Sequence, residues 1–331
     1  MTSLTIVVVN WRSPEMTVAA LQSLQSHLED IEDLRVAIVD NDSQDGSASK
    51  IRGAVEQRGW SRWVTLIEAP RNGGFAYGSN VAIRAMRSRG ALPDFVMFLN
   101  PDTIVRPGAL RILVDFMHTH PNVGIAGGCS EDADGTSQFC CFRFPNALGE
   151  FGHYLRLGIF DRLAASIITR IGIPEHARQV DWVSGAAMIV RRSVFEDVGT
   201  LDEEYFLYYE ETDFTLRARR AGWQCWHVPQ SRIVHFVGQS SGVTKRDWPP
   251  QRLPDYWYES RRRYFVLNHG LTYAVLTDVL VILAHGMWSL RNLMRKNRER
   301  ASPQFVRDFL RNSALRKGTR GLALRKILTF R

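Results

Sequence analysis

Cysteine is scarce in this chain of 331 residues, and no pattern typical of a zinc site is present. The four cysteines form no C-x-x-C pair, and no histidine clusters with them: Cys129, Cys140, Cys141 and Cys225. This argues against a zinc site or the disulfide frame of a secreted protein, and favours free thiols in a reducing cytoplasm. The apolar stretch of residues 1–10 has no Lys or Arg before it and no small-residue cleavage site, so we expect a buried strand there and not a signal peptide.

Acidic residues are nearly missing from residues 291–331. This tail has thirteen Lys and Arg against two acids, Glu299 and Asp308, and therefore carries a charge of +11. The whole chain carries +8, so residues 1–290 are left at −3. The balance argues against nucleic acid as a partner of the main domain, and it predicts an anionic partner for the tail.

One long apolar run, residues 271–290, directly precedes the basic tail. Its length is close to the roughly 20 residues of a membrane span, although Asp278 and His285 interrupt it. It could span the membrane, lie in the interface, or pack on the catalytic domain or a second subunit. We expect residues 271–331 to associate with an anionic membrane surface at the cytoplasmic face, peripherally or as a single C-terminal span; a homo-oligomer stays open.

Apolar, β-branched segments alternate with helical patterns in the first half of the chain. Such segments are typical of strands buried on both faces, and here they cover residues 4–9, 35–39, 63–68 and 95–99. A helix is predicted to begin at Pro14 with Ser13 as its N-cap. The alternation predicts an α/β fold: a doubly wound, mostly parallel sheet with helices on both faces.

The second half of the chain is less regular. Residues 130–180 show no clear period, whereas residues 181–191 are strand-like. Ser193 is expected to cap a short helix, and residues 210–221 form a further helical pattern. We find no internal repeat and no low-complexity segment.

Polar side chains follow the predicted strands, at the sheet edge where ligands gather in such folds. They lie in Asn10-Trp11, Asp40-Asn41-Asp42 and Asn100-Pro101-Asp102. Asp40 either belongs to a polar turn or accepts a hydrogen bond from a pyrimidine imide N–H, which would select uracil or thymine over cytosine. Asp102 likewise either sits in a turn or holds a divalent ion that neutralises a diphosphate, with His235 as a candidate further ligand.

Two more segments are candidates for binding and catalysis. RNGGFAYGSN, residues 71–80, places three glycines where a helix begins, which lets the backbone approach an anion, although it has neither a G-x-G-x-x-G nor a G-K-[ST] pattern. The acids Glu210, Glu211 and Asp213 either complement a helix dipole or include a general base. Because like charges lie close together in such a cluster, the pKa of that base would be raised. The candidate nucleotide-binding residues are Asn10, Asp40, Asp42, Asn72, Gly73, Gly74, Gly78 and Asn80.

Taken in order, the motifs resemble the family 2 glycosyltransferases of the GT-A fold, and most closely their rhamnosyltransferase-like branch. The matching pieces, over about residues 4–265, are V-V-V-N-W, V-D-N-D-S-x-D-G-S, N-x-G-F-A-x-G-x-N, L-N-P-D-T, S-G-A-A-M-I-V-R-R, Y-Y-E-E-T-D-F and H-x-x-G-x-S. The resemblance implies that Asp40, with help from Asp42, binds the nucleobase of the donor. It also implies that Glu211 is the general base of catalysis. It also implies that Asp102 binds a divalent cation (Mg or Mn), with His235 as a metal or diphosphate ligand.

The same resemblance places an acceptor-side wall at Trp182–Met188, with Trp182, Gly185 and Asp213 as sugar or acceptor contacts. The chain departs from the family pattern at two points. Asn100-Pro101-Asp102 replaces the common D-x-D and leaves one carboxylate, and Glu211 stands where Asp is more frequent. The base therefore stays open between Glu210 and Glu211.

The implied activity is inverting transfer of a sugar to a lipid-linked or polysaccharide acceptor, with rhamnose from dTDP-rhamnose expected first and a UDP-hexose next. A sugar-phosphate nucleotidyltransferase would need a Gly-rich loop after the first strand, but residues 10–14 are NWRSP. A non-catalytic, membrane-docked nucleotide-sugar-binding protein is a further alternative. We expect a catalytic domain at residues 1–265, with a nucleotide-binding half (1–125) and an acceptor half (126–265), followed by the C-terminal segment 266–331.

Overall fold

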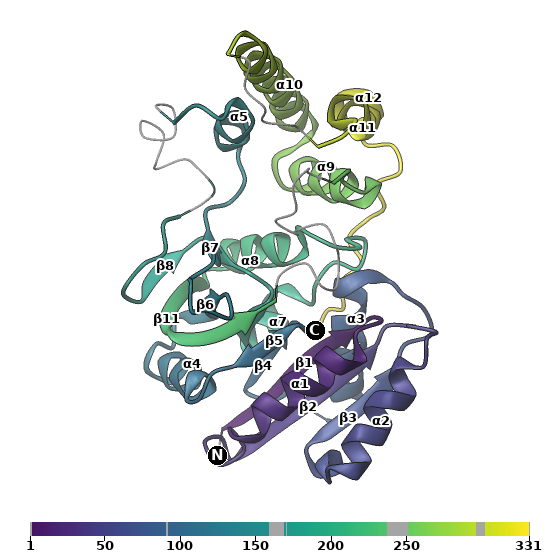
Figure 1. Cartoon of the computed structure of the whole chain (residues 1–331), viewed down its shortest axis with the longest axis vertical. Coiled ribbons are helices and arrows are strands. Elements are labelled where there is room, and N and C mark those ends of the chain that lie inside the picture. The colour runs from purple at the N-terminus through teal and green to yellow at the C-terminus, as the bar shows by residue number, and fades with distance from the viewer. Residues whose placement is uncertain are drawn as a thin grey trace.

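A computed structural model describes residues 2–90, 92–158, 169, 171–236, 251–295 and 302–330. Its centre is a nine-stranded sheet in the order β3-β2-β1-β4-β10-β6-β11-β5, with β8 paired to β11; β7 and β9 form a separate small sheet (Figure 1). The strands are β1 (Ser3–Asn10), β2 (Asp33–Asp40), β3 (Val64–Glu68), β4 (Phe95–Leu99), β5 (Thr103–Val105), β6 (Val123–Glu131), β7 (Cys141–Phe142), β8 (Arg178–Val180), β9 (Trp182–Val183), β10 (Ala187–Arg191) and β11 (Gln224–His235).

Helices cover both faces of the large sheet, as predicted. Side chains of α1, α2 and α4 pack against one face, and side chains of α3, α7 and α8 pack against the other. The alternate residues of β1 enter the two cores, which explains why this strand is apolar throughout. The helices are α1 (Pro14–Gln25), α2 (Ser47–Gln57), α3 (Gly74–Ser88), α4 (Ala109–Thr119), α5 (Ala147–Leu155), α7 (Arg192–Val198), α8 (Glu210–Arg220), α9 (Asp255–His269), α10 (Leu271–Met294), α11 (Phe305–Asn312) and α12 (Ala314–Lys317), with a 3₁₀ turn η1 at Trp60–Arg62.

The parallel arrangement predicted for the sheet holds for its first half, β3-β2-β1-β4. Beyond β4 the sheet is mixed, because β10 inserts antiparallel between β4 and β6. The predicted strand 181–191 is two strands: β9 pairs with β7, the chain turns at residues 184–186, and β10 joins the large sheet. The following helix begins at Arg192, so Ser193 lies inside it and does not cap it.

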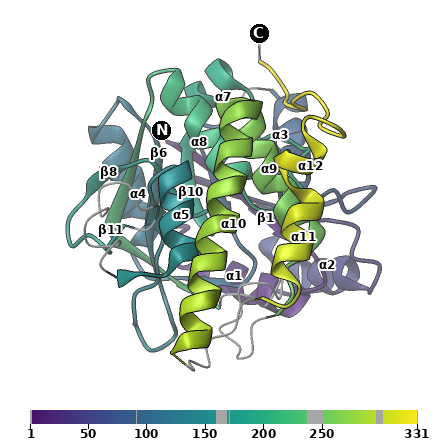
Figure 2. The same cartoon turned by 90° about the horizontal axis from the view of Figure 1, so that it is seen from above.

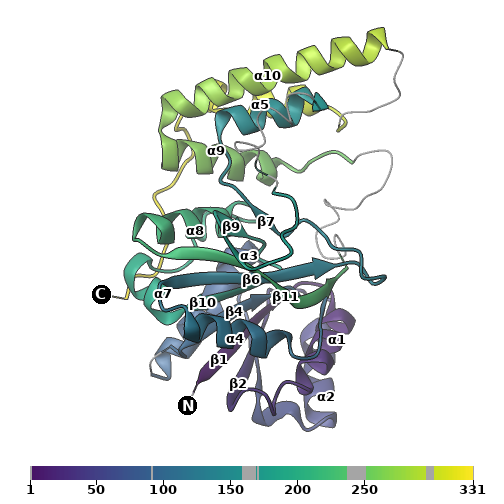
Figure 3. The same cartoon turned by 90° about the vertical axis from the view of Figure 1, so that its left-hand side faces the viewer.

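A layer of helices lies beyond the sheet, on the side of α8 (Figures 1 and 3). It consists of α5, α9, α10 and α11, and α10 packs along α5 and against α9 and α12. Figure 2, which looks down on this layer, shows α10 lying across it between α5 and α11. Since α9 runs from Asp255 to His269, the layer begins before residue 266, where we had expected the C-terminal segment to start.

The end of the chain returns from this layer to the catalytic half. The backbone N–H of Thr200 donates to Leu328 at 3.1 Å, and that of Glu203 donates to Lys326 at 3.0 Å. Arg87 donates to the carbonyl of Thr329. The basic tail is therefore divided: its last described residues lie against α3 and the loop before α8, and only its earlier part lies in the helical layer.

Candidate active site

A cavity of about 540 Å³ opens at the carboxyl edge of the large sheet. The ends of β1 and β4, the start of α3, the turn before β10 and the start of α8 enclose it. It brings together seven of the predicted site residues: Asn72, Gly74, Asp102, Gly185, Glu210, Glu211 and His235.

Asp40 lies beside this cavity but is not part of its lining. Its buried carboxylate accepts hydrogen bonds from Asn10 Nδ2 at 2.7 Å, from Ser43 Oγ at 2.6 Å and from Ser43 N at 3.1 Å. Asn10 in turn accepts from Thr17 Oγ1 at 2.8 Å, so it ties β1, β2 and α1 together. Asp42 follows with a left-handed backbone (φ 56°) and accepts from Gln44. Recognition of a nucleobase by Asp40 and Asp42 therefore stays a prediction. The contacts that both carboxylates make in the structure are to other residues of the protein.

The glycines of residues 71–80 permit close packing of the protein's own chain. A Cβ on Gly74, which has φ +84°, would lie 1.8 Å from the carbonyl oxygen of Phe206, and one on Gly78 would lie 2.7 Å from Val9 Cγ1. A Cβ on Gly73 would likewise strike the ring of Tyr77.

Two backbone N–H groups in the first turn of α3 already have hydrogen-bond acceptors within the protein. The N–H of Phe75 donates to Phe206 at 2.9 Å, and Gly74 N donates to Asn72 Oδ1 at 3.0 Å. Asn80 is buried and donates to Leu201 and Glu203, away from the cavity. The predicted anion cradle thus has fewer open donors than its sequence suggests.

Asp102 and His235 meet in the cavity, although they are far apart in sequence. Asp102 Oδ1 lies 3.4 Å from His235 Nε2, is buried and has no hydrogen-bond partner. Asn100 Nδ2 lies 3.4 Å from the same nitrogen. Within the described residues no group of three or more His, Cys, Asp or Glu side chains could hold a metal ion. Asp102 and His235 present one carboxylate oxygen and one imidazole nitrogen that could coordinate a cation. Residues 238 and 240 of the H-x-x-G-x-S motif lie outside the described residues.

Glu210 and Glu211 occupy the first turn of α8, and the backbone before them is unusual. Tyr208 and Tyr209 both have φ 69°, a left-handed conformation that costs a non-glycine residue about 1–3 kcal/mol. Oε2 of each glutamate has no hydrogen-bond partner. Burial, and then the neighbouring Glu211, raise the pKa of Glu210 well above its usual range. Burial also raises the pKa of Glu211 to about 7, although backbone N–H groups such as that of Gly185 oppose the shift.

A second cavity, of about 960 Å³, lies on the other side of Glu211. The two cavities share Phe139, Tyr208 and Glu211, whereas Glu210 lines the first cavity alone. Trp182, the predicted acceptor-wall residue, lines the second cavity and stacks on Phe142 with ring centroids 4.3 Å apart. Glu211 therefore stands at the junction of two spaces.

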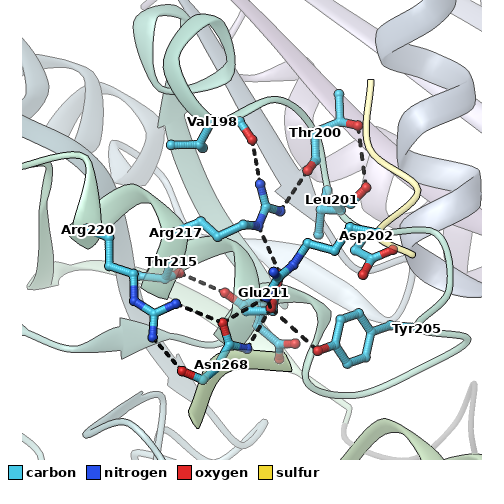
Figure 4. Close-up of polar contacts among 12 residues, drawn as sticks. Val198, Thr200, Leu201, Asp202, Tyr205, Glu211, Thr215, Arg217, Arg220 and Asn268 are labelled. Atoms are coloured by element: carbon cyan, nitrogen blue, oxygen red, sulfur yellow. Dashed lines mark hydrogen bonds and ion pairs between the residues drawn. The ribbon is translucent and has the colours of Figure 1, made fainter. Parts of the chain in front are cut away.

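Asp213 does not reach either cavity. Its buried carboxylate accepts from Arg217 Nε and Arg325 Nη2, both at 2.9 Å, and from Asn268 Nδ2 at 2.8 Å. Burial opposes ionisation here, but Arg217 and Arg325 outweigh it and lower the pKa of Asp213. Figure 4 shows Arg217 reaching Val198 and Thr200 on one side of this network, and Asn268 beside Arg220 on the other. We had placed Asp213 among the sugar contacts; its position makes it the anchor of α8 instead.

Several cavity residues were missed in the sequence. Asn41 lies between the two predicted acids; its Nδ2 donates to Asn72 at 2.9 Å and to the carbonyl of Gly74 at 3.0 Å. Phe139 and Phe206 are exposed aromatic side chains in segments with no regular period, so only their exposure in the fold marks them. Tyr256 comes from α9 and packs on Phe206 with ring centroids 5.3 Å apart. No local sequence signal connects it to the cavity.

The fold is the GT-A fold of glycosyltransferases. The structure of GalNAc-T7 with UDP, GalNAc and Mn²⁺ superposes with a TM-score of 0.59 at 11% identity, covering 95% of this chain and 59% of that one. Residues 2–248 match the glycosyltransferase-like family 2, and the chain belongs to that family.

Curated relatives cover the chain well. The N-acetylglucosaminyl-diphospho-decaprenol L-rhamnosyltransferase of Mycobacterium tuberculosis is 29% identical over 296 residues, which are 85% of this chain and 86% of that protein. The dTDP-rhamnosyl transferase RfbF of Shigella flexneri is 28% identical over 229 residues, 67% of this chain and 70% of that protein. The predicted resemblance to rhamnosyltransferase-like family 2 enzymes is confirmed.

The Asp213 network predicts that the chain end stabilises the catalytic helix. Arg325→Ala should lower the free energy of unfolding by about 1–2 kcal/mol, because a buried carboxylate loses a charged partner and keeps two others. Urea denaturation measures this. Lys326→Ala is the matched control, since that side chain is exposed, and it should change stability by less than about 0.5 kcal/mol. Equal effects of the two substitutions would contradict the anchoring role.

Proposed function

We propose that this glycosyltransferase moves a sugar, with inversion, from a nucleotide diphosphate in the 540 Å³ cavity to an acceptor in the 960 Å³ cavity. The observation that carries this proposal is the position of Glu211, whose unpartnered carboxylate oxygen stands where the two cavities join. Rhamnose carried on dTDP is the first donor to test, because two relatives are rhamnosyltransferases and one is named for dTDP. A UDP-hexose is the alternative, supported by the fold neighbour with bound UDP.

Glu211 would act as the general base. An acceptor hydroxyl entering from the larger cavity donates its proton to the carboxylate as its oxygen attacks the anomeric carbon, and the nucleoside diphosphate leaves. A single displacement of this kind inverts the anomeric centre and requires no covalent nucleophile. A pKa of about 7 suits the task, because the base is then ionised near neutral pH and still basic enough to take the proton.

Asp102 and His235 would hold a divalent cation, Mg²⁺ or Mn²⁺, beside the donor diphosphate. The buried, unpartnered Asp102 Oδ1 facing His235 Nε2 fits such a role. The bound cation supplies neutralisation of the negative charge that develops on the leaving diphosphate. Asn100 would keep the His235 ring oriented through its amide.

The helical layer would dock the enzyme on the cytoplasmic leaflet, where a lipid-linked acceptor is presented. One face of α10 is buried, whereas the other exposes an apolar stripe at helical spacing: Leu276, Val279, Leu283, Met287, Leu290 and Met294. α10 is also the one helix of the described residues that is long and apolar enough to cross a membrane. Its buried face carries Asp278, which pairs with Arg261 at 2.6 Å, so an in-plane orientation is favoured over a span. Exposed Arg295, Arg307 and Arg311 add attraction to anionic lipid.

The base assignment predicts that Glu211→Gln keeps donor binding and loses transfer, since the amide cannot accept a proton. In the wild type, kcat should fall about tenfold per pH unit below pH 7 and level off above it, because the base must be ionised. Transfer assays from pH 5 to 9, with donor titration calorimetry, measure both effects. Glu210→Gln is the matched control and should retain most activity. If Glu210→Gln is inactive and Glu211→Gln is active, the general base is Glu210 and not Glu211.

The cation site predicts that Asp102→Ala lowers kcat at least about 100-fold while the protein stays folded, since metal assistance contributes several kcal/mol to the transition state. EDTA should have the same effect on the wild type, and added Mn²⁺ or Mg²⁺ should restore it. Asp33→Ala serves as the control, because Asp33 begins β2 at the edge of the sheet away from the cavity; this change should leave kcat unaltered. Full activity in EDTA would refute metal dependence.

The docking surface predicts that the double variant Leu283→Glu/Met287→Glu no longer floats with anionic liposomes. Both side chains are exposed, so the change should leave stability nearly unaffected. Wild-type flotation should fall only in part at high salt, because apolar burial is insensitive to salt. Leu324→Glu, an exposed site off α10, should float like the wild type. A wild-type protein that stays soluble at low salt would overturn the docking model.

A further inference from the structure

The 960 Å³ cavity has a chemical character that differs from that of the donor cavity. Its walls come from the start of α8, from β7 and β9 with the residues that follow β7, and from α5. The donor cavity contains Asp102, His235 and both glutamates, whereas this cavity contains Arg143, His153 and Arg156. Its carboxylates are Glu150 and Glu211, and Glu150 pairs with Arg261 at 2.7 Å. The cavity therefore offers cationic groups to an anionic ligand.

The small sheet joins an aromatic wall to one of these cations. Phe142 in β7 stacks on Trp182 in β9, with 21° between the ring planes. Trp182 Nε1 donates to the backbone carbonyl of Arg143 at 2.9 Å, so the backbone that follows β7 is held beside the indole, and Arg143 and Trp182 line the same cavity. A cavity lined by both an aromatic surface and arginine suits a saccharide that is linked to a phosphate.

Arg156 connects the cavity to the helical layer. It ends α5 with a left-handed backbone (φ 50°), and its guanidinium lies over the ring of Trp288 in α10, 4.5 Å from the centroid. Arg291 of α10 donates to the carbonyls of Leu155 and Arg156 at 2.9 and 2.7 Å. The cavity is thus lined both by Glu211 and by a cation that contacts the helix exposing the apolar stripe.

We propose that this cavity binds the diphosphate of a lipid-linked saccharide acceptor through Arg143 and Arg156. The saccharide then lies along Phe142 and Trp182 with a hydroxyl at Glu211, and the lipid leaves toward α10. Guanidinium groups recognise phosphate oxygens through paired N–H donors, which suits this ligand. The inference rests on the proposed function for the identity of the saccharide acceptor. It assigns a second diphosphate site, separate from the donor site at Asp102 and His235.

The test compares two acceptors with the same sugar: a short polyprenyl-diphosphate saccharide and a neutral alkyl glycoside. In Arg143→Gln and Arg156→Gln, KM for the diphosphate acceptor should rise about tenfold or more, as expected for a lost charge-assisted hydrogen bond. KM for the nucleotide-sugar donor and for the neutral glycoside should stay within about twofold of the wild type. Arg156→Lys should give a KM between those of the wild type and Arg156→Gln, because lysine keeps the charge but lacks the paired N–H donors of the guanidinium. Arg89→Gln, an exposed arginine of neither cavity, is the control.

Direct titration with farnesyl diphosphate separates this inference from the proposed function. Wild-type protein should bind it, both glutamine variants should bind it about tenfold more weakly or worse, and inorganic pyrophosphate with Mn²⁺ should bind all three equally, at the donor site. If no donor supports transfer but this binding pattern holds, the proposed function fails and the site stands. Unchanged farnesyl diphosphate binding in the two variants, or an equal loss for both acceptors, would overturn the site.

Discussion

The buried carboxylate of Asp213 is the constraint on which the catalytic geometry depends. A carboxylate without access to water is tolerated only when cations and hydrogen-bond donors surround it. Here the donors come from α8 itself, from the end of α9 and from the last residues of the chain. Asp213 lies one turn or less from Glu210 and Glu211, so the same network fixes the proposed base. The position of the proposed base therefore depends in part on Arg325, more than a hundred positions away in sequence.

Two further buried arginines of α9 extend this principle. Arg263 pairs with Asp202 at 2.6 Å, and Arg261 pairs with Glu150 and Asp278. Arg263 joins the helical layer to the loop before α8, whereas Arg261 ties α9 to α5 and α10 within the layer. Removing one partner would leave an uncompensated buried charge, which costs several kcal/mol. The layer is thus bound to the sheet domain by the Arg263–Asp202 ion pair as well as by apolar contact, and a division at residue 266 would cut through α9.

Much of the fold could be predicted from the sequence, because local patterns carry it. The strands β1 to β4 and the helix α8 follow from apolar runs and helical spacing, and β4 has the bounds that were expected. The break between β9 and β10 could not be predicted, since a continuous apolar run hides a change of sheet. Family resemblance and candidate chemistry predicted that Asp102 and His235 would lie together. Asp102 directly precedes β5, and β5 pairs with the end of β11, where His235 lies. Asp213 was misplaced because a run of acids does not show which member points inward.

The arrangement of the two cavities bears on the stereochemistry that we propose. In a single displacement the incoming oxygen must approach the anomeric carbon from the face opposite to the leaving diphosphate. Asp102 and His235, which we propose to face the diphosphate, line the smaller cavity, and Glu211 lines both cavities. A sugar held between these groups would present its free face to the larger cavity, where Glu211 can take the proton of the attacking hydroxyl. Retention would require a nucleophilic side chain on that same face. A carboxylate cannot take a proton and form a covalent bond to the anomeric carbon in the same step, so we assign Glu211 the proton and propose a single displacement.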